Sequence, residues 1–117
     1  MTGDDLHELC LSFPGTSADH PFGPDTIVYR VVGKLFALAP EGADPLRVNL
    51  KCEPLLAMQL RDEYPTAVLP GYHMNKQHWN TVVVDGSIDD DLVVTMVEDS
   101  YDLVVSSLPK AKRPAGA

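Results

Sequence analysis

One stretch of the sequence gathers most of the side chains that could recognise another molecule. Residues 70–81 hold the only tryptophan and two of the four histidines, with amide side chains and a lysine, and contain no acidic residue. Amide and ammonium groups beside flat rings can contact phosphates and base edges. A stretch made only to fill a core would be more apolar, so we interpret it as a contact surface. Its candidate binding residues are His73, Asn75, Lys76, His78, Trp79 and Asn80.

The pattern of these residues favours binding over catalysis. The chain lacks the serine nucleophile motif, the phosphate-binding loop, the dinucleotide glycine motif and the helical zinc motif. His73 and His78 are five positions apart in a predicted loop, which is not the spacing of a metal-binding pair on one helix face. The acidic run at residues 89–91 suits the positive end of a helix dipole better than a calcium site. We therefore expect no enzyme, no metal and no cofactor.

Length and composition are those of one ordinary domain. A chain of 117 residues, 44% hydrophobic and 22% charged, can bury a core without a metal or disulfide. Its apolar runs are shorter than the roughly 20 residues that a membrane span needs. Residues 1–5 are acidic and do not resemble a secretion signal, so we expect a cytoplasmic protein. Cys10 and Cys52 are isolated and match no disulfide or metal framework, so both should be reduced.

Charge is divided along the chain. The net charge of −8 argues against non-specific attraction to nucleic acid or anionic membranes. However, residues 1–25 and 85–108 contain acidic residues and no lysine or arginine, whereas residues 26–84 carry slightly more basic than acidic residues. A domain over residues 1–109 should therefore have acidic ends and a basic middle. Residues 110–117 form a basic Pro/Ala/Gly tail that we expect to be disordered.

The first half of the chain predicts a helix followed by three strands. Apolar residues recur at helical spacing until Pro14 and Gly15 end the helix, and residues 16–25 have the composition of a loop. Residues 26–32 and 35–39 form a predicted hairpin. Residues 46–51 then alternate apolar and polar, as in a strand with one wet face. Arg47, Asn49 and Lys51 should therefore share a solvent-facing row.

The second half predicts a helix, two strands and a long helix. Pro54 suits the first turn of a short helix over residues 54–64, and residues 67–69 and 79–84 read as strands. The last helix follows, with Ser87 as the expected N-cap and one apolar stripe. The resulting order, α-β(3)-α-β(2)-α, predicts an α+β two-layer sandwich, an antiparallel sheet with helices on one face. The opposite face, with Arg47, Asn49 and Lys51, should be the most positive surface.

The chain resembles the MmcQ/YjbR family of small bacterial proteins over nearly all of residues 9–109. The resemblance is carried by six motifs in order. They are FPG at residues 13–15, DHPFGPD at 19–25, GKLFA at 33–37, LRVNLKC at 46–52, PGYHMNKQHWNT at 70–81 and SYDLV at 100–104.

The resemblance implies a fold similar to the secretion-chaperone-like sandwich and to the frataxin-like and double-wing arrangements. Through the double-wing likeness it implies a DNA-binding protein, a fold-level analogy that brings no catalytic residues. The alternative is an anionic small molecule or a protein partner bound through the same loop and sheet face. Iron delivery, as in frataxin-like proteins, is a further alternative.

Overall fold

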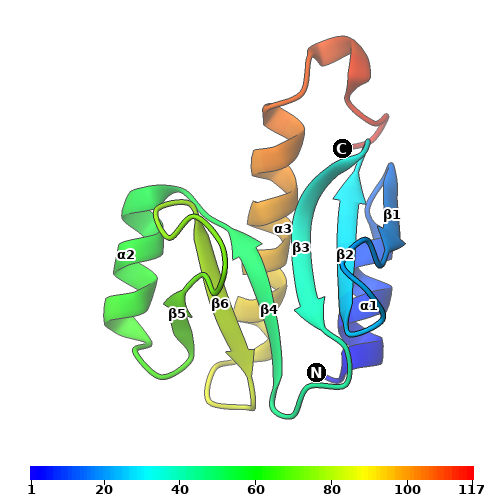
Figure 1. The fold of residues 1–117 in the computed structure, drawn as a ribbon. Coiled ribbons are helices and arrows are strands. Elements are labelled where there is room, and N and C mark those ends of the chain that lie inside the picture. The colour runs from blue at the N-terminus through cyan, green and yellow to red at the C-terminus, as the bar shows by residue number, and fades with distance from the viewer.

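Six antiparallel strands form one sheet in the order β1-β2-β3-β4-β6-β5 in the computed structural model, which describes residues 1–117 (Figure 1). The strands are β1 (Thr16–Asp19), β2 (Thr26–Val31), β3 (Lys34–Pro40), β4 (Leu46–Lys51), β5 (Val68–Pro70) and β6 (Trp79–Val84). The helices are α1 (Gly3–Ser12), α2 (Pro54–Glu63) and α3 (Asp90–Ser106), followed by the 3-10 turn η1 (Lys110–Lys112).

All three helices cover the same face of the sheet. Leu6 and Cys10 of α1 join Val93 and Val97 of α3 in one core with the apolar residues of β2, β3, β4 and β6. Leu60 of α2 packs against the same core. Figure 1 shows α1 and α3 behind the sheet, leaving its front without a covering helix. The α+β two-layer sandwich with helices on one face is confirmed.

The sequence predicted five strands, and the sixth is β1 within the segment expected to be a loop. β1 pairs with β2, with Thr16 opposite Val31 and Asp19 opposite Val28. Its four residues are small, three of them are polar, and three of the four are exposed. This edge strand is held by backbone pairing with β2 and buries little side-chain surface. Its sequence therefore shows no alternation of apolar and polar residues that would predict a strand. The observed order is therefore α-β(4)-α-β(2)-α.

The sheet is incomplete between β3 and β4. Only two residue pairs join these strands, Ala37 with Leu50 and Leu38 with Asn49. Figure 1 shows the two strands diverging beyond this short contact, with α3 behind the opening. Ser100 of α3 fills this position and is fully buried.

The ends of the helices follow capping chemistry. Thr2 caps α1, because its side chain accepts from the Asp5 N–H and the Asp5 carboxylate accepts from the Thr2 N–H. α3 begins later than predicted, with Asp89 rather than Ser87 at the N-cap. The Ser87 N–H instead donates to the Asp85 carboxylate.

The C-terminal residues pack back onto the domain where the sequence predicted disorder. Arg113 donates to the carbonyl oxygens of Ser106 and Leu108 at the end of α3. Pro114 then lies against Gly15, so closely that a Cβ at Gly15 would be 2.6 Å from its ring.

No helix of the structure combines the length and the apolar character needed to cross a lipid bilayer.

Candidate functional site

The register of β4 and β6 defines the face that the helices leave open. Lys51 lies opposite Trp79, Asn49 opposite Thr81, and Arg47 opposite Val83. Directly opposed residues in an antiparallel pair point to the same side of a sheet. The predicted row of Arg47, Asn49 and Lys51 therefore exists, and we call this side of the sheet the open face.

Asn49 lies in that row but is not exposed to solvent, which corrects the sequence-based expectation. Only 7% of its surface is accessible. Its Nδ2 donates to the carbonyl oxygen of Tyr72 at 3.1 Å, and its Oδ1 accepts from the Thr81 hydroxyl at 2.6 Å. The Tyr72 N–H donates to the Thr81 oxygen at 3.0 Å. Asn49 therefore has a structural role. It holds the carbonyl of Tyr72, while Thr81 holds the N–H of the same residue.

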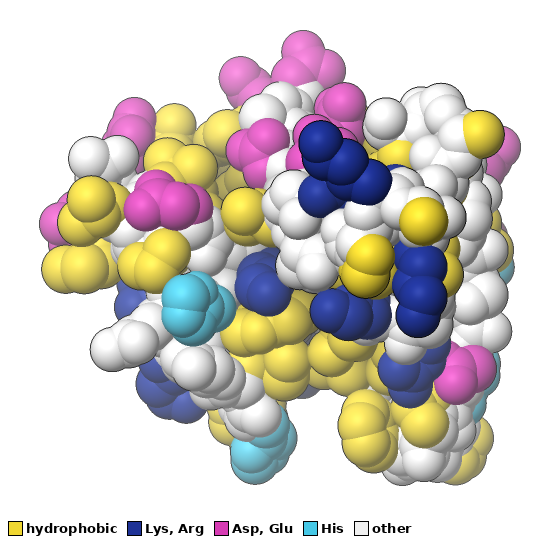
Figure 2. Space-filling view, turned by 90° about the horizontal axis from the view of Figure 1, so that it is seen from above, with side chains coloured by type: hydrophobic (Ala, Val, Ile, Leu, Met, Phe, Trp, Pro, Cys, Tyr) yellow, Lys and Arg dark blue, Asp and Glu magenta, His cyan; other side chains and the backbone are white.

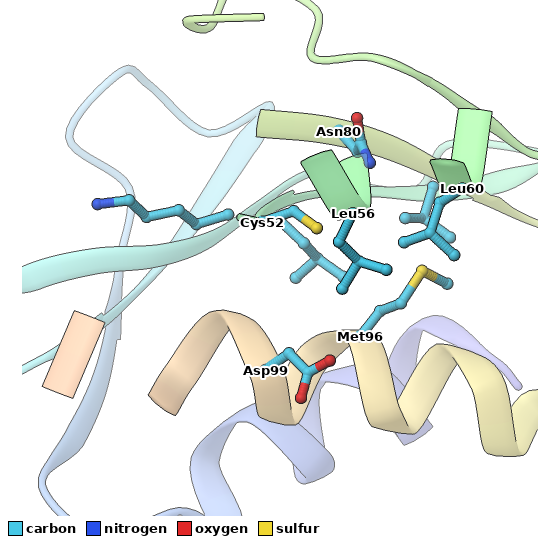
Figure 3. A pocket seen from close by; sticks show the side chains of 9 residues that line it. Cys52, Leu56, Leu60, Asn80, Met96 and Asp99 are labelled. Atoms are coloured by element: carbon cyan, nitrogen blue, oxygen red, sulfur yellow. The ribbon is translucent and has the colours of Figure 1, made fainter. Parts of the chain in front are cut away.

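Asn80 points away from the open face. It pairs with Leu50, whose side chain belongs to the core, and it is 2% exposed. Its Oδ1 accepts from Arg61 Nε at 2.7 Å, and its Nδ2 donates to the Ala57 carbonyl at 3.5 Å. Figure 3 shows Asn80 beside α2, on the side of the sheet where Leu56 also lies. Asn80 joins β6 to α2 and cannot contact a ligand on the open face.

The loop between β5 and β6, residues 71–78, has a fixed shape. The Asn75 side chain accepts from the Gln77 N–H, and its carbonyl accepts from the N–H groups of His78 and Trp79. Asn75 is exposed, but its side-chain oxygen serves the turn. At the loop base a Cβ on Gly71 would come within 2.8 Å of the Trp79 backbone oxygen, so this position requires glycine.

Two cationic side chains, Lys76 within the loop and Arg61 from α2, donate hydrogen bonds to its backbone. Lys76 is exposed and its Nζ donates to the Gly71 carbonyl at 3.2 Å. Arg61, which the sequence analysis did not select, reaches from α2 and donates to the carbonyl oxygens of Trp79 and Lys76 as well as to Asn80. No sequence signal marks Arg61, since its partners lie on a different element.

The tip of the loop presents two rings. Tyr72 is 67% exposed, and its ring centroid lies 4.0 Å from that of His73. His73 has φ +59°, a left-handed conformation that is uncommon for residues other than glycine. His78 and Trp79 are half-buried. The exposed rings of the site are therefore His73 and Tyr72, and Tyr72 lies inside residues 70–81 but was not among the candidate binding residues.

A groove of about 330 Å³ crosses the open face beside these rings. One wall is the loop with Tyr72 and His73, and the other is formed by Asp25, Thr26 and Pro40. Arg47 and Asn49 lie between the walls. Figure 2 shows the hollow between two projecting parts of the surface, one of which carries histidine. The sequence could not foresee this groove, because its lining comes from five separate segments.

Charge is separated between the two faces. Arg47 and Lys51 make no ion pair, whereas Arg30, which also borders the sheet, is neutralised by Asp19 at 3.1 Å. In Figure 2 the Asp and Glu side chains gather mainly over the helices, and Lys and Arg side chains lie along the sheet side. The acidic residues of α1 and α3 are Asp4, Asp5, Glu8, Asp90, Asp91, Glu98, Asp99 and Asp102.

The cysteines lie away from the groove. Burial raises the pKa of Cys10 to about 12, and burial also raises the pKa of Cys52, so both thiols stay protonated near neutral pH. Cys52 borders the gap between α2 and α3 with Leu56, Leu60 and Met96 (Figure 3). That gap has a volume of only about 10 Å³, the space of one water molecule.

No cluster of three or more histidine, cysteine or acidic side chains is arranged to hold a metal ion.

The fold and the site together define an α+β sandwich with one helix-covered face and one open, cation-bearing face. The chain belongs to the YjbR family, whose model matches residues 11–103. This confirms the resemblance inferred from the six sequence motifs.

Relatives and solved structures agree over the whole domain. YbdF of Escherichia coli O157:H7 is 37% identical over 114 residues, which cover 94% of this chain and 93% of the relative. YjbR of Escherichia coli K12 is 35% identical, with 97% and 95% covered. Both are described as uncharacterized proteins. The crystal structure of DR2400 from Deinococcus radiodurans, a DUF419 domain, superposes with a TM-score of 0.91 at 37% identity, covering 96% of this chain and 85% of that one.

Proposed function

We propose that this chain is a non-enzymatic, cytoplasmic DNA-binding protein whose binding surface is the open face with the 71–78 loop. The observation that carries the proposal is the separation of charge between the two faces. Arg47 and Lys51 lie on the open face without a carboxylate partner, while the helices hold most of the acidic residues on the other side. A protein of net charge −8 can approach a polyanion only through such a restricted surface.

The positions of the two cations suit a phosphate backbone. They are four residues apart on β4, which corresponds to roughly 13 Å along a strand. Two free cations at this separation can contact different phosphates of one nucleic acid. Lys76 lies on the 71–78 loop beside this face and is exposed, so binding would neutralise two or three phosphates.

The test is a salt titration of DNA binding by fluorescence anisotropy. With two or three phosphate contacts, the logarithm of the association constant should fall against the logarithm of salt concentration with a slope of about −2 to −3. Replacing both Arg47 and Lys51 by alanine should weaken binding and make the slope shallower by about one per removed contact. Lys112→Ala is the matched control, because it removes a cation of the C-terminal turn.

Absence of binding to any DNA at low salt would overturn the proposal, as would equal binding by wild type and the Arg47/Lys51 double variant.

An anionic small molecule is the second candidate, and the groove of about 330 Å³ favours it, since small-molecule pockets start at about this size. Such a ligand would bind with a weak dependence on salt. Calorimetry with small anions at two salt concentrations separates the two cases.

A further inference from the structure

The groove on the open face has a feature that a simple cationic surface does not need, namely a pair of exposed rings held in a fixed position. Tyr72 is anchored through its carbonyl to Asn49 and through its N–H to Thr81. Asn49 and Thr81 are themselves buried and bonded to each other. The backbone of Tyr72 is therefore immobilised, although its ring remains 67% exposed.

His73 places a second ring beside that of Tyr72, and its backbone adopts an unfavourable conformation to do so. Its φ of +59° is disfavoured for a side chain with a Cβ, and such conformations persist where function requires the geometry. The result is that its ring lies 4.0 Å from the Tyr72 ring, tilted by 49°. Neither side chain makes a hydrogen bond within the protein. The Tyr72 hydroxyl and the His73 ring nitrogens are therefore not held in place by hydrogen bonds of the fold.

The walls of the groove differ in charge. Arg47 is exposed and without an ion-pair partner, and its planar guanidinium fork matches phosphate oxygens. Arg47 lies between the two walls, and Asp25 lies on the wall that faces Tyr72 and His73. A carboxylate there repels phosphate and accepts hydrogen bonds from exocyclic amino groups of bases. A phosphate is therefore directed to Arg47 between the walls, and a base fits between the rings on one wall and the Asp25 carboxylate on the other.

We infer that the groove binds one unpaired nucleotide of single-stranded nucleic acid, with its base stacked on the Tyr72–His73 pair and its phosphate on Arg47. This inference rests on the proposed function and narrows it. A duplex stacks its bases on each other and offers only their edges, whereas an unpaired base exposes a face that an aromatic ring can cover.

A second exposed ring supports a strand rather than an isolated nucleotide. Phe22 is 73% exposed on the segment that leads into the Asp25 wall. Rings on both sides of a cationic groove are typical of proteins that bind single strands with little sequence preference. Phe22 gives the neighbouring nucleotide a place to stack outside the groove.

The experiment compares one labelled oligonucleotide as a single strand and as a duplex, by fluorescence anisotropy at one salt concentration. Wild type should bind the single strand more tightly. Tyr72→Ala should weaken single-strand binding roughly tenfold to a hundredfold while changing duplex binding little, because the ring contributes stacking and not charge. Tyr72→Phe should retain most of the affinity, since it keeps the ring. Leu55→Ala, which removes a 68% exposed apolar side chain from α2, is the matched control.

The outcomes separate this inference from the proposed function. Duplex binding equal to or tighter than single-strand binding, with Tyr72→Ala affecting both alike, would overturn the inference and leave the DNA-binding proposal standing. Failure to bind either form at low salt would overturn both. Tyr72→Ala should stay folded, because the ring is exposed. Tyr72→Phe keeps the ring, so its binding tests the stacking role in a variant that retains the side-chain packing.

Discussion

Ser100 Oγ accepts a hydrogen bond from the Lys51 N–H at 2.8 Å and donates one to the Phe36 carbonyl at 2.5 Å. These two backbone groups belong to β4 and β3, at the point where the strands no longer pair with each other. A side chain of α3 thus replaces a sheet hydrogen bond. Lys51, a cation of the open face, is positioned by a residue on the helix-covered face.

Ser100→Ala should lower the free energy of unfolding by about 2–4 kcal/mol, because it leaves a buried N–H and a buried C=O without partners while changing the volume little. Chemical denaturation measures the change. Ser106→Ala, at an exposed position of the same helix, is the control. A loss below half a kilocalorie per mole would show that water replaces the hydroxyl or that the strands close up.

Arg61→Ala should destabilise the domain by about 2–4 kcal/mol, because three oxygen acceptors on Asn80, Trp79 and Lys76 lose a charged donor. The same variant should increase hydrogen exchange at the amides of His78 and Trp79, which close the loop turn. Gln59→Ala, exposed on α2, is the comparison. Protection of these amides unchanged from wild type would contradict the assigned role of Arg61.

His73→Gly should stabilise the protein by about 1 kcal/mol while weakening ligand binding. Glycine near φ +59° avoids the penalty of about 1–2 kcal/mol that a Cβ incurs, and this gain exceeds its larger entropy loss on folding, roughly 0.5–1 kcal/mol. Denaturation midpoints and anisotropy titrations give the two quantities on the same sample. A variant that is destabilised would mean that the imidazole makes a stabilising contact, and one that binds as wild type would remove His73 from the site.

Cys10 predicts a specific alkaline dependence of stability. Burial raises its pKa from 9.0 to about 12, so above pH 9 the unfolded thiol ionises while the folded thiol stays protonated. The stability contributed by this group is complete below pH 9 and is lost as pH rises toward 12, by at most about 4 kcal/mol.

The measurement is the difference in unfolding free energy between wild type and Cys10→Ala across that pH range. The difference should shrink as pH rises, because the alanine variant has a cavity but no thiol to ionise. Burial, and then the charge of Cys10, also raise the pKa of Tyr29; the part caused by burial is common to both proteins and cancels, whereas the part caused by Cys10 does not. A difference that stays constant with pH would contradict the prediction.

The sequence predicts the sheet face of Arg47 and Lys51 well, because the strict alternation over residues 46–51 requires one wet side. The prediction that Asn80 belongs to the binding surface is wrong, and the alternation of side chains along a strand explains why. Trp79 and Asn80 are neighbours in a strand, so they cannot share a face. Residues 70–81 therefore do not form one surface, because the strand that begins at Trp79, as predicted, sends successive side chains to opposite faces.

Other features cannot be read from local pattern. Asn49 is buried because Tyr72, 23 positions away, covers it, and the groove exists because the 71–78 loop and the segment around Asp25 project from the same side. Arg61 looks like an ordinary last-turn cation of α2. Such relationships arise only when the elements are assembled.

Two consecutive residues of β6 hold the 71–78 loop from opposite sides of the sheet. Thr81 fixes Tyr72 on the open face, and Asn80 connects through Arg61 to Trp79 and Lys76 on the other. A loop secured in this way is not a lid that closes over its ligand. Recognition should therefore be close to lock-and-key, with little ordering entropy to lose and with association limited by diffusion and orientation rather than by a conformational change.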